Sequence, residues 1–152
     1  MIEITNKALD PEKITAKVRK DTNGGVVTFL GITRLFNDGR KVQHLEYEAY
    51  RPMADKKLKE IVQETKAKWG IEDVAIAHRI GRLAIGEISM VVAVGSPHRK
   101  EAFEAAQYVV DLIKDMVPIW KKEVFEGGEV WIGSQSEDPT HGHKPVSKKK
   151  KS

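Results

Sequence analysis

The amino-acid sequence predicts an α+β fold in which a mixed sheet and about three helices form two layers. Short apolar or alternating stretches, typical of strands, are interleaved with three longer stretches of helical periodicity. Tight-turn signals connect some strands and longer crossovers connect others, so both antiparallel and parallel neighbours are expected. The 152 residues, of which 40% are hydrophobic, suffice for one domain with a substantial core.

The N-terminal part is predicted to form two strands and a short helix. Residues 1–5 alternate as a strand. Asp10-Pro11-Glu12 provides the N-cap, the first-turn proline and the acid that begin a helix extending to about residue 19. Residues 26–32, VVTFLGI, are β-rich and almost entirely apolar, which indicates a strand buried on both faces.

The middle of the chain is predicted to form a hairpin strand and then a helix. Asn37-Asp38-Gly39 is a turn signal, and residues 42–50 alternate behind it. Residues 54–69 place apolar side chains on one helical stripe, and Gly70 is suited to end that helix in a left-handed conformation.

The second half is predicted to contain three strands and the third helix. Residues 74–78 and 88–95 read as strands joined by a turn over 81–87, and residues 129–132 read as the last strand. Ser96-Pro97 should begin the helix. Its expected buried face comprises Ala102, Phe103, Ala106, Val109, Val110 and Ile113.

The segment after this helix carries the most informative pattern in the chain. Pro118 disfavours helical geometry in the residue before it, so the helix that carries Lys114 should end near Met116. The chain can then fold back and bring the ammonium groups of Lys114 and Lys121 to one pocket. The alternative is that these lysines only complement the negative end of the helix dipole.

Two further cations, His98 and Arg99, follow Ser96-Pro97 in the predicted first turn. Free N–H groups and the positive end of the dipole attract anions there, and an imidazole beside a guanidinium suits a phosphate. The alternative is a solvent-exposed pair tolerated at small cost. Arg34 is a weaker candidate because strand-end loops collect binding residues. Gly31 before it suits either a close backbone approach or a plain bulge.

The net charge of +4 originates in the C-terminal tail. Residues 137–152 hold five of the 26 basic and two of the 22 acidic residues, so residues 1–136 hold 21 basic and 20 acidic residues, a net of +1. We therefore predict a folded domain over 1–136 and a Lys-rich disordered tail over 137–152.

Composition also excludes several kinds of site. The absence of cysteine excludes disulfides, a thiolate nucleophile and a thiolate-bound metal. His141 and His143 lack the further ligands that a metal needs, so no metal site is predicted. His44 and His78 lie in strand patterns and are interpreted as structural histidines. The chain has no run of 18 apolar residues and no leader, which predicts a cytoplasmic protein without a membrane span.

Several blocks, in their order and spacing, resemble the large, catalytic subunit of molybdopterin synthase over roughly residues 1–133. They are VVTFLGITR with Asn37-x-Gly39, LEYEAYRPMA, HRIGRLAIGE, and SPHRKEAFEAAQYVVDLIKDMVPIWKKE followed by GGEVW. The family more often has G-x-V-R where this chain has GITR, which leaves the position of Arg34 intact. The Lys-rich C-terminus has no counterpart in the resemblance.

The resemblance implies an α/β hammerhead fold with a small additional β-rich subdomain, and a sulfur-transferring enzyme of molybdenum-cofactor biosynthesis. The family converts cyclic pyranopterin monophosphate (precursor Z) into molybdopterin by inserting two sulfurs as a dithiolene. The sulfur arrives on the C-terminal Gly-Gly thiocarboxylate of a small ubiquitin-like subunit, so the lack of cysteine is compatible with catalysis. No cofactor is implied beyond this substrate and product. The large subunit forms a homodimer, with one small subunit at each far end of a heterotetramer.

The resemblance also implies roles for individual residues. The family's two lysines match Lys114 and Lys121, which are the expected catalytic residues. The expected substrate-binding residues are Phe29, Ile32, Thr33, Arg34, His98, Arg99, Lys122 and Glu123. For four of them, backbone contacts with the substrate are as compatible with the resemblance as side-chain contacts: Ile32, Thr33, Lys122 and Glu123. Because the family completes its pocket across the dimer, His98 and Arg99 are candidates for the neighbouring subunit's site.

Two other classes of function are compatible with parts of the sequence. The lysine tail and a pI of about 9.2 are features of a nucleic-acid-binding module, although the near-neutral body argues against this as the main function. A non-catalytic scaffold that binds only the small subunit would keep the fold, but it would not need the paired lysines.

Overall fold

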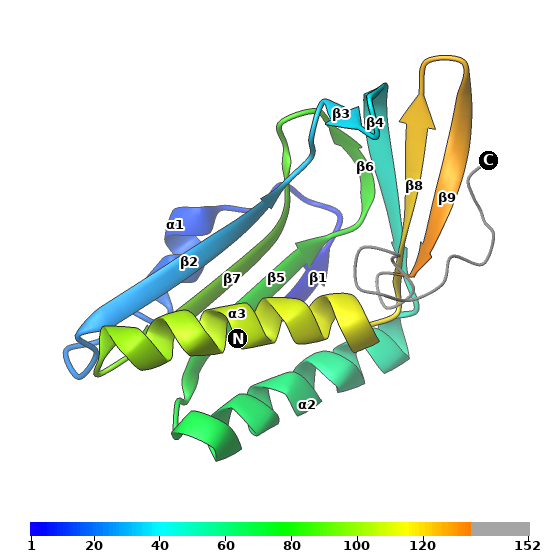
Figure 1. The fold of residues 1–152 in the computed structure, drawn as a ribbon. Helices are drawn as coiled ribbons and strands as arrows, with labels where there is room; N and C mark the ends of the chain where they lie inside the picture. Colours follow the sequence, from blue (N-terminus) through cyan, green and yellow to red (C-terminus); the bar gives the residue numbers. More distant parts are fainter. Residues whose placement is uncertain (135–152) are drawn as a thin grey trace.

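The computed structural model describes residues 1–134 of the chain (Figure 1). The N-terminal elements are β1 (Ile2–Thr5), α1 (Pro11–Ala16), β2 (Gly25–Ile32), β3 (Phe36–Asn37), β4 (Arg40–Ala49) and α2 (Arg51–Trp69). The following elements are β5 (Asp73–Arg79), β6 (Gly81–Ala84), β7 (Ile88–Ser96), α3 (Arg99–Met116), β8 (Ile119–Phe125) and β9 (Gly128–Ser134). The predicted C-terminal tail and its two histidines lie outside the described residues.

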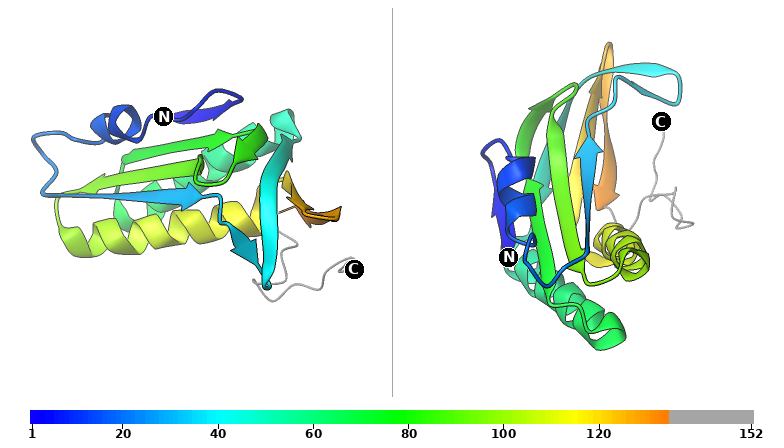
Figure 2. Two further views of the ribbon diagram at one scale, coloured as in Figure 1. Left: turned by 90° about the horizontal axis from the view of Figure 1, so that it is seen from above. Right: turned by 90° about the vertical axis from the view of Figure 1, so that its left-hand side faces the viewer.

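The first sheet has the strand order β1-β5-β7-β2, with β1 parallel to β5 and the other neighbours antiparallel. Side chains alternate along its central strands. Ile76 and Val92 belong to the larger core beneath α2 and α3, whereas Ala75 and Val91 pack with Ile14 of α1. Figure 2 shows α1 on the face opposite α2 and α3. The predicted α+β class with a mixed sheet is confirmed, and α1 adds cover on the second face beyond the two predicted layers.

The second sheet is the small β-rich subdomain that the resemblance implied. Its order is β3-β4-β8-β9, and β6 also pairs with β4. Strand β4 runs antiparallel to β8, with Leu45 opposite Glu123. Because α3 runs along the first sheet and leads directly into β8, the C-terminal end of α3 lies where the two sheets meet (Figure 1).

Strand β2 is not buried on both faces, contrary to the sequence prediction. It is an edge strand of the first sheet, and four of its apolar side chains are at least 36% exposed: Val26, Phe29, Leu30 and Ile32. A nearly continuous apolar run predicts that a strand is buried, but it does not identify the surface that covers the strand. The described part of the chain supplies no neighbour on this edge.

The start of the third helix also differs from the prediction. Ser96 is the last residue of β7, and α3 begins at Arg99 with His98 as its N-cap. The Ser96 hydroxyl instead accepts a hydrogen bond from the His98 backbone N–H at 3.4 Å, within the bend between strand and helix. On the helix itself, Phe103 is 63% exposed and Ala105 is buried, so the stripe that faces the sheet excludes the predicted phenylalanine.

Other predicted boundaries shift by a few residues. Helix α1 ends at Ala16 rather than near residue 19. Helix α2 begins at Arg51, because extended Tyr50 is its N-cap and Pro52 lies in its first turn. Residues 81–84 form β6 where a turn was expected.

The predicted helix-end signals at three positions are confirmed. Asp10 caps α1 by accepting a hydrogen bond from the Lys13 backbone N–H, and Gly70 ends α2 with a φ of 70°. Helix α3 ends at Met116, with extended Val117 as its C-cap before Pro118. Within residues 1–134, no helix is long and apolar enough to cross a membrane.

Candidate active site

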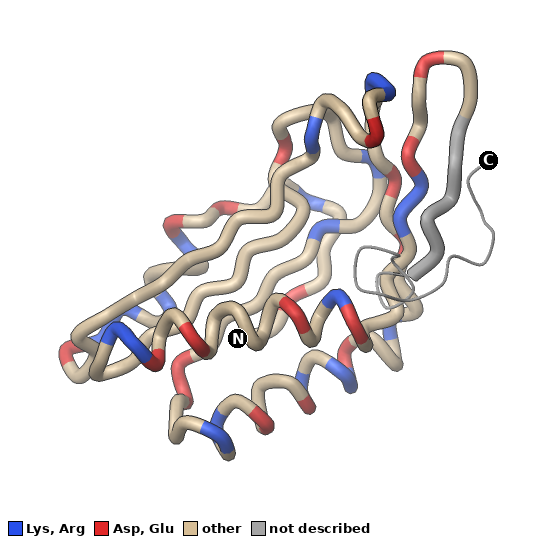
Figure 3. The backbone as a smooth tube through the Cα atoms, viewed as in Figure 1, with Lys and Arg blue, Asp and Glu red and all other residues tan. Residues whose placement is uncertain are grey.

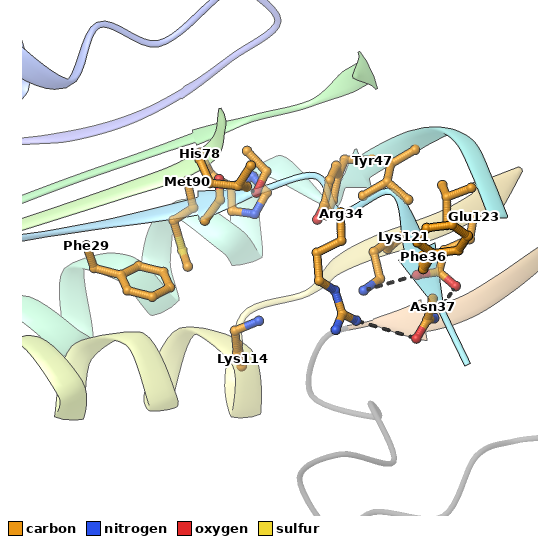
Figure 4. A pocket seen from close by; sticks show the side chains of 15 residues that line it. Phe29, Arg34, Phe36, Asn37, Tyr47, His78, Met90, Lys114, Lys121 and Glu123 are labelled. Carbon is orange, nitrogen blue, oxygen red and sulfur yellow. Dashed lines mark hydrogen bonds and ion pairs between the residues drawn. The ribbon is translucent and has the colours of Figure 1, made fainter. Parts of the chain in front are cut away.

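A cavity of about 310 Å³ lies where the two sheets and the end of α3 meet. Side chains from both sheets, from the β2–β4 connection and from α3 line it (Figure 4). The lining residues are Phe29, Gly31, Ile32, Arg34, Phe36, Asn37, Val42, Leu45, Tyr47, His78, Ser89, Met90, Lys114, Lys121 and Glu123.

The two predicted lysines line this same cavity. Lys114 extends from the last turn of α3, and Lys121 extends from β8 after the chain has turned at Pro118 (Figure 4). The prediction from the helix end is therefore confirmed, because the break after α3 lets two lysines seven positions apart line the same cavity. Arg34 reaches the cavity from the loop that follows β2. The register of β2 against β7 shifts between Gly31 and Ile32, so a bulge precedes this loop.

A hydrogen-bonded network joins the cations on the two sides of the cavity. The Arg34 guanidinium donates to the Asn37 amide oxygen at 3.4 Å, and the Asn37 amide NH₂ donates to Glu123 at 2.6 Å. The second carboxylate oxygen of Glu123 lies 3.8 Å from the Lys121 ammonium. Glu123 is only 3% exposed, and these two contacts offset the cost of burying its charge.

His78 lies in the cavity wall and is held as a neutral imidazole. Its Nδ1 donates to the Arg79 carbonyl oxygen at 2.9 Å, and its ring packs edge-on against Tyr47. The pKa of His78 is lowered to about 4, chiefly by burial and also by the charge of Lys114, against the opposing effect of the Arg79 hydrogen bond. With His78 neutral, the cavity residues in the described part of the chain include three cations, Arg34, Lys114 and Lys121, and one carboxylate, that of Glu123. The cavity is therefore suited to anions.

Two predicted binding residues do not place their side chains in the cavity. Thr33 is 2% exposed and absent from the cavity lining, and its backbone N–H and C=O pair with Glu87 and Gly86. Lys122 also does not line the cavity, and its ammonium lies 3.3 Å from Glu46. Successive side chains of a strand point to opposite faces, so Lys121 and Lys122 of β8 cannot both face the cavity. Phe29 and Ile32 do line it.

His98 and Arg99 lie at the opposite end of α3 and do not line this cavity. The helix rises 1.5 Å per residue, so the backbone of residue 98 is about 24 Å from that of Lys114. Within one copy of the chain, the predicted phosphate-binding pair therefore lies far from the predicted lysines.

The structure adds cavity residues that the sequence analysis did not select. His78 was interpreted as structural and Asn37 only as part of a turn, yet both line the cavity together with Tyr47, Ser89 and Met90. A signal for His78 was available, because it stands at the end of an apolar strand, where binding residues collect. No local pattern identifies Tyr47 or Met90, whose side chains alternate with others in ordinary strands.

The comparisons with known proteins agree with this fold. A family model described as "MoaE protein" matches residues 4–116. The "Molybdopterin synthase catalytic subunit" of Bacillus subtilis (strain 168) is 50% identical over 135 residues, covering 89% of this chain and 86% of the relative.

Solved structures show the same arrangement of elements. The crystal structure of molybdopterin synthase from Staphylococcus aureus has a TM-score of 0.82 at 44% identity, covering 86% of this chain and 95% of that one. The protein–protein complex of subunits 1 and 2 of molybdopterin-converting factor from Helicobacter pylori 26695 shares the fold, with a TM-score of 0.68 at 24% identity. That match covers 86% of this chain and 88% of the other. The chain belongs to the MoaE family.

Proposed function

We propose that this chain is the catalytic subunit of molybdopterin synthase. It would convert precursor Z into molybdopterin in the cytoplasm, by sulfur transfer from the thiocarboxylated C-terminus of a small ubiquitin-like subunit. The observation that carries the proposal is that Lys114 and Lys121, from two different elements, line one cavity together with Arg34. The names of the relatives and the match to the MoaE family support it.

The cations of the cavity answer an electrostatic requirement of this reaction. The substrate phosphate and the thiocarboxylate are both anions, and two unit charges a few ångströms apart repel by about 4 kcal/mol at a protein surface. The cationic side chains offset this repulsion while both reactants are bound. Lys114 would stand beside the thiocarboxylate and stabilise the charge that develops as its acyl–sulfur bond breaks. Lys121 would act on the pterin side, as an electrostatic clamp or as the proton donor to the leaving oxygen.

The small subunit supplies what this chain lacks. The sequence contains no cysteine, so no thiolate of its own can carry the sulfur. A C-terminal Gly-Gly segment has no side chains, and such a slender tail suits entry into a cavity of about 310 Å³. The Helicobacter pylori complex of two subunits, which shares this fold, is compatible with such a partner.

A second copy of this chain would complete the site. His98 and Arg99 are too far from Lys114 to meet it within one chain, so a phosphate can contact both groups only if another copy brings its own pair to this cavity. The exposed apolar edge of β2 is the surface we assign to that contact. A shallow hollow beside it, between β2 and α3, includes exposed Phe103. The expected assembly is a homodimer with one small subunit at each far end.

The direct test is reconstitution. The purified chain is mixed with the thiocarboxylated small subunit and precursor Z, and molybdopterin is measured. Product should form with the thiocarboxylate and not with the same small subunit ending in an ordinary carboxylate. Absence of product with both proteins folded and the thiocarboxylate verified by mass spectrometry would refute the proposal.

A nucleic-acid-binding function makes a different prediction. It requires affinity that falls steeply with salt and disappears with the Lys-rich tail. In the described part of the chain, Lys and Arg are interspersed with Asp and Glu along α2 and α3 (Figure 3). We therefore favour the enzyme.

A further inference from the structure

Asn37 precedes a tight turn, but its side chain also lines the cavity and forms hydrogen bonds there. It lies at the end of β3, and the next two residues, Asp38 and Gly39, have positive φ values of 51° and 75°. Two such residues form the tight turn that joins β3 to β4. This turn fixes the Asn37 backbone, and its amide then extends between Arg34 and Glu123 (Figure 4).

The two neighbours of this amide have opposite hydrogen-bonding properties. The Arg34 guanidinium can only donate, and the ionised Glu123 carboxylate can only accept. A side chain between them must therefore present an acceptor on one side and a donor on the other. The Asn37 amide does this, with its oxygen 3.4 Å from Arg34 and its nitrogen 2.6 Å from Glu123.

Glu123 explains why the amide matters for the cations. A buried carboxylate in an anion-binding cavity opposes the ligand unless it has another task. One oxygen of Glu123 is held by Asn37, and the other lies 3.8 Å from the Lys121 ammonium. Without the Asn37 N–H, the carboxylate would be free to turn both oxygens toward Lys121 or toward Arg34, and so to neutralise a cation that should face the substrate.

We propose that Asn37 is a positioning residue for the reaction, which holds Arg34 on one side and the Glu123–Lys121 pair on the other. It thereby sets the separation of two cations that face the cavity. This inference rests on the proposed function, because the rate of that reaction is what reports a displaced cation. Misplacement of a catalytic group by about 1 Å is enough to lower a rate by about two orders of magnitude.

The test uses the reconstituted reaction with two variants of Asn37. Asn37→Asp keeps the acceptor for Arg34 but replaces the donor with a carboxylate that repels Glu123 toward Lys121. We expect kcat to fall at least about 10-fold with a smaller change in KM for precursor Z. Asn37→Ala releases Arg34 as well, so KM should also rise. A purely structural role would instead lower the thermal midpoint and affect both variants alike.

A polarity swap is the decisive control. In the double variant Asn37→Asp/Glu123→Gln, the new glutamine amide donates to the new aspartate, which restores one donor and one acceptor. Its kcat should exceed that of Asn37→Asp. The effects of the two single substitutions on kcat should therefore not multiply in the double variant. The matched control, Asn6→Asp, changes an exposed asparagine outside the cavity and should leave kcat unchanged.

The outcomes separate this inference from the proposed function. If the wild-type chain makes no molybdopterin, the proposed function fails and the inference fails with it. If the wild-type chain is active and Asn37→Asp and Asn37→Ala retain kcat and KM within about 2-fold, only the inference fails. Independent, multiplying effects of Asn37→Asp and Glu123→Gln would overturn it equally. Should Asn37→Asp not fold, Asn37→Ala decides.

Discussion

At the scale of single residues, some side chains of the cavity provide its charge and others hold the charged groups in position. Lys114, Lys121 and Arg34 provide the positive charge, and Glu123 reduces it by one unit while it pairs with Lys121. His78 lies among these groups without adding charge, because burial holds its pKa near 4. A protonated imidazole beside Lys114 would raise the electrostatic repulsion among the cations of the cavity.

Replacement of Lys114 by alanine should abolish molybdopterin formation without unfolding the protein. The expected loss in kcat is at least about 100-fold, the size typical of removing one preorganised electrostatic contact to a transition state. Lys59→Ala, an exposed lysine of α2, is the matched control. Near-normal turnover of the Lys114 variant would refute its catalytic role.

The buried His78 should make stability depend on pH. In the unfolded chain its pKa is about 6.5, and in the folded chain it is about 4, so the unfolded state binds a proton first as the pH falls. Stability contributed by the neutral imidazole is therefore complete above pH 6.5 and is lost on acidification. The free energy of unfolding should fall by about 2 kcal/mol between pH 7 and pH 5.

Urea unfolding at several pH values measures this loss. His78→Gln should remove the dependence in that window, where carboxylates are still ionised. An equally steep pH dependence in the glutamine variant would show that another group causes it.

At the scale of elements, the end of α3 and the edge strand β2 have different physical origins. Helix α3 ends at Met116 for a local reason, because Pro118 excludes helical geometry from Val117. Strand β2 is an edge for a non-local reason, because β7 occupies one side and no described element occupies the other. Its exposed apolar side chains are the expected contact with a second copy.

Leu30→Lys should shift the protein from dimer to monomer. Leu30 is 38% exposed on β2 and does not line the cavity, so the substitution places a charge on the assigned interface and leaves the cavity lining of its own chain unchanged. Sedimentation at micromolar concentrations measures the shift. Met53→Lys, at a methionine of α2 that is 37% exposed, should leave the dimer intact. A dimer that survives in the Leu30 variant would exclude the β2 edge as its interface.

At the scale of the whole molecule, α3 separates two groups that the proposed reaction brings together. His98 and Arg99 begin the helix and Lys114 is near its end, so one chain holds them about 24 Å apart. Arg99→Ala should raise the apparent dissociation constant of precursor Z more than it lowers the single-turnover rate at saturation, because the role proposed for Arg99 is to bind the phosphate.

Mixing two defective chains tests whether the site is shared. Lys114→Ala and Arg99→Ala homodimers should both be nearly inactive when precursor Z is below the wild-type KM. After the chains are mixed and exchanged, half of the dimers are mixed and each mixed dimer has one intact site, so about a quarter of wild-type activity should return. If Arg99 served the site of its own chain, every site would stay defective and no activity would return.

Much of the fold followed from local patterns in the sequence. Capping residues located α1, Gly70 located the end of α2, and Pro118 located the end of α3, because each signal depends on backbone geometry within a few residues. The resemblance to the catalytic subunit of molybdopterin synthase came from blocks of sequence alone. The break that brings Lys114 and Lys121 together was predictable for the same local reason.

The tertiary structure alone decided which surfaces these elements face. Strand periodicity puts Lys121 and Lys122 on opposite faces of β8. Only the packing of β8 against β4 shows that the Lys121 side chain is the one that faces the cavity. The burial of His78, the exposure of β2 and the bridge from Asn37 to Glu123 likewise depend on partners far along the chain. Local sequence determines where an element begins and ends, whereas burial and charge pairing are set by non-local neighbours.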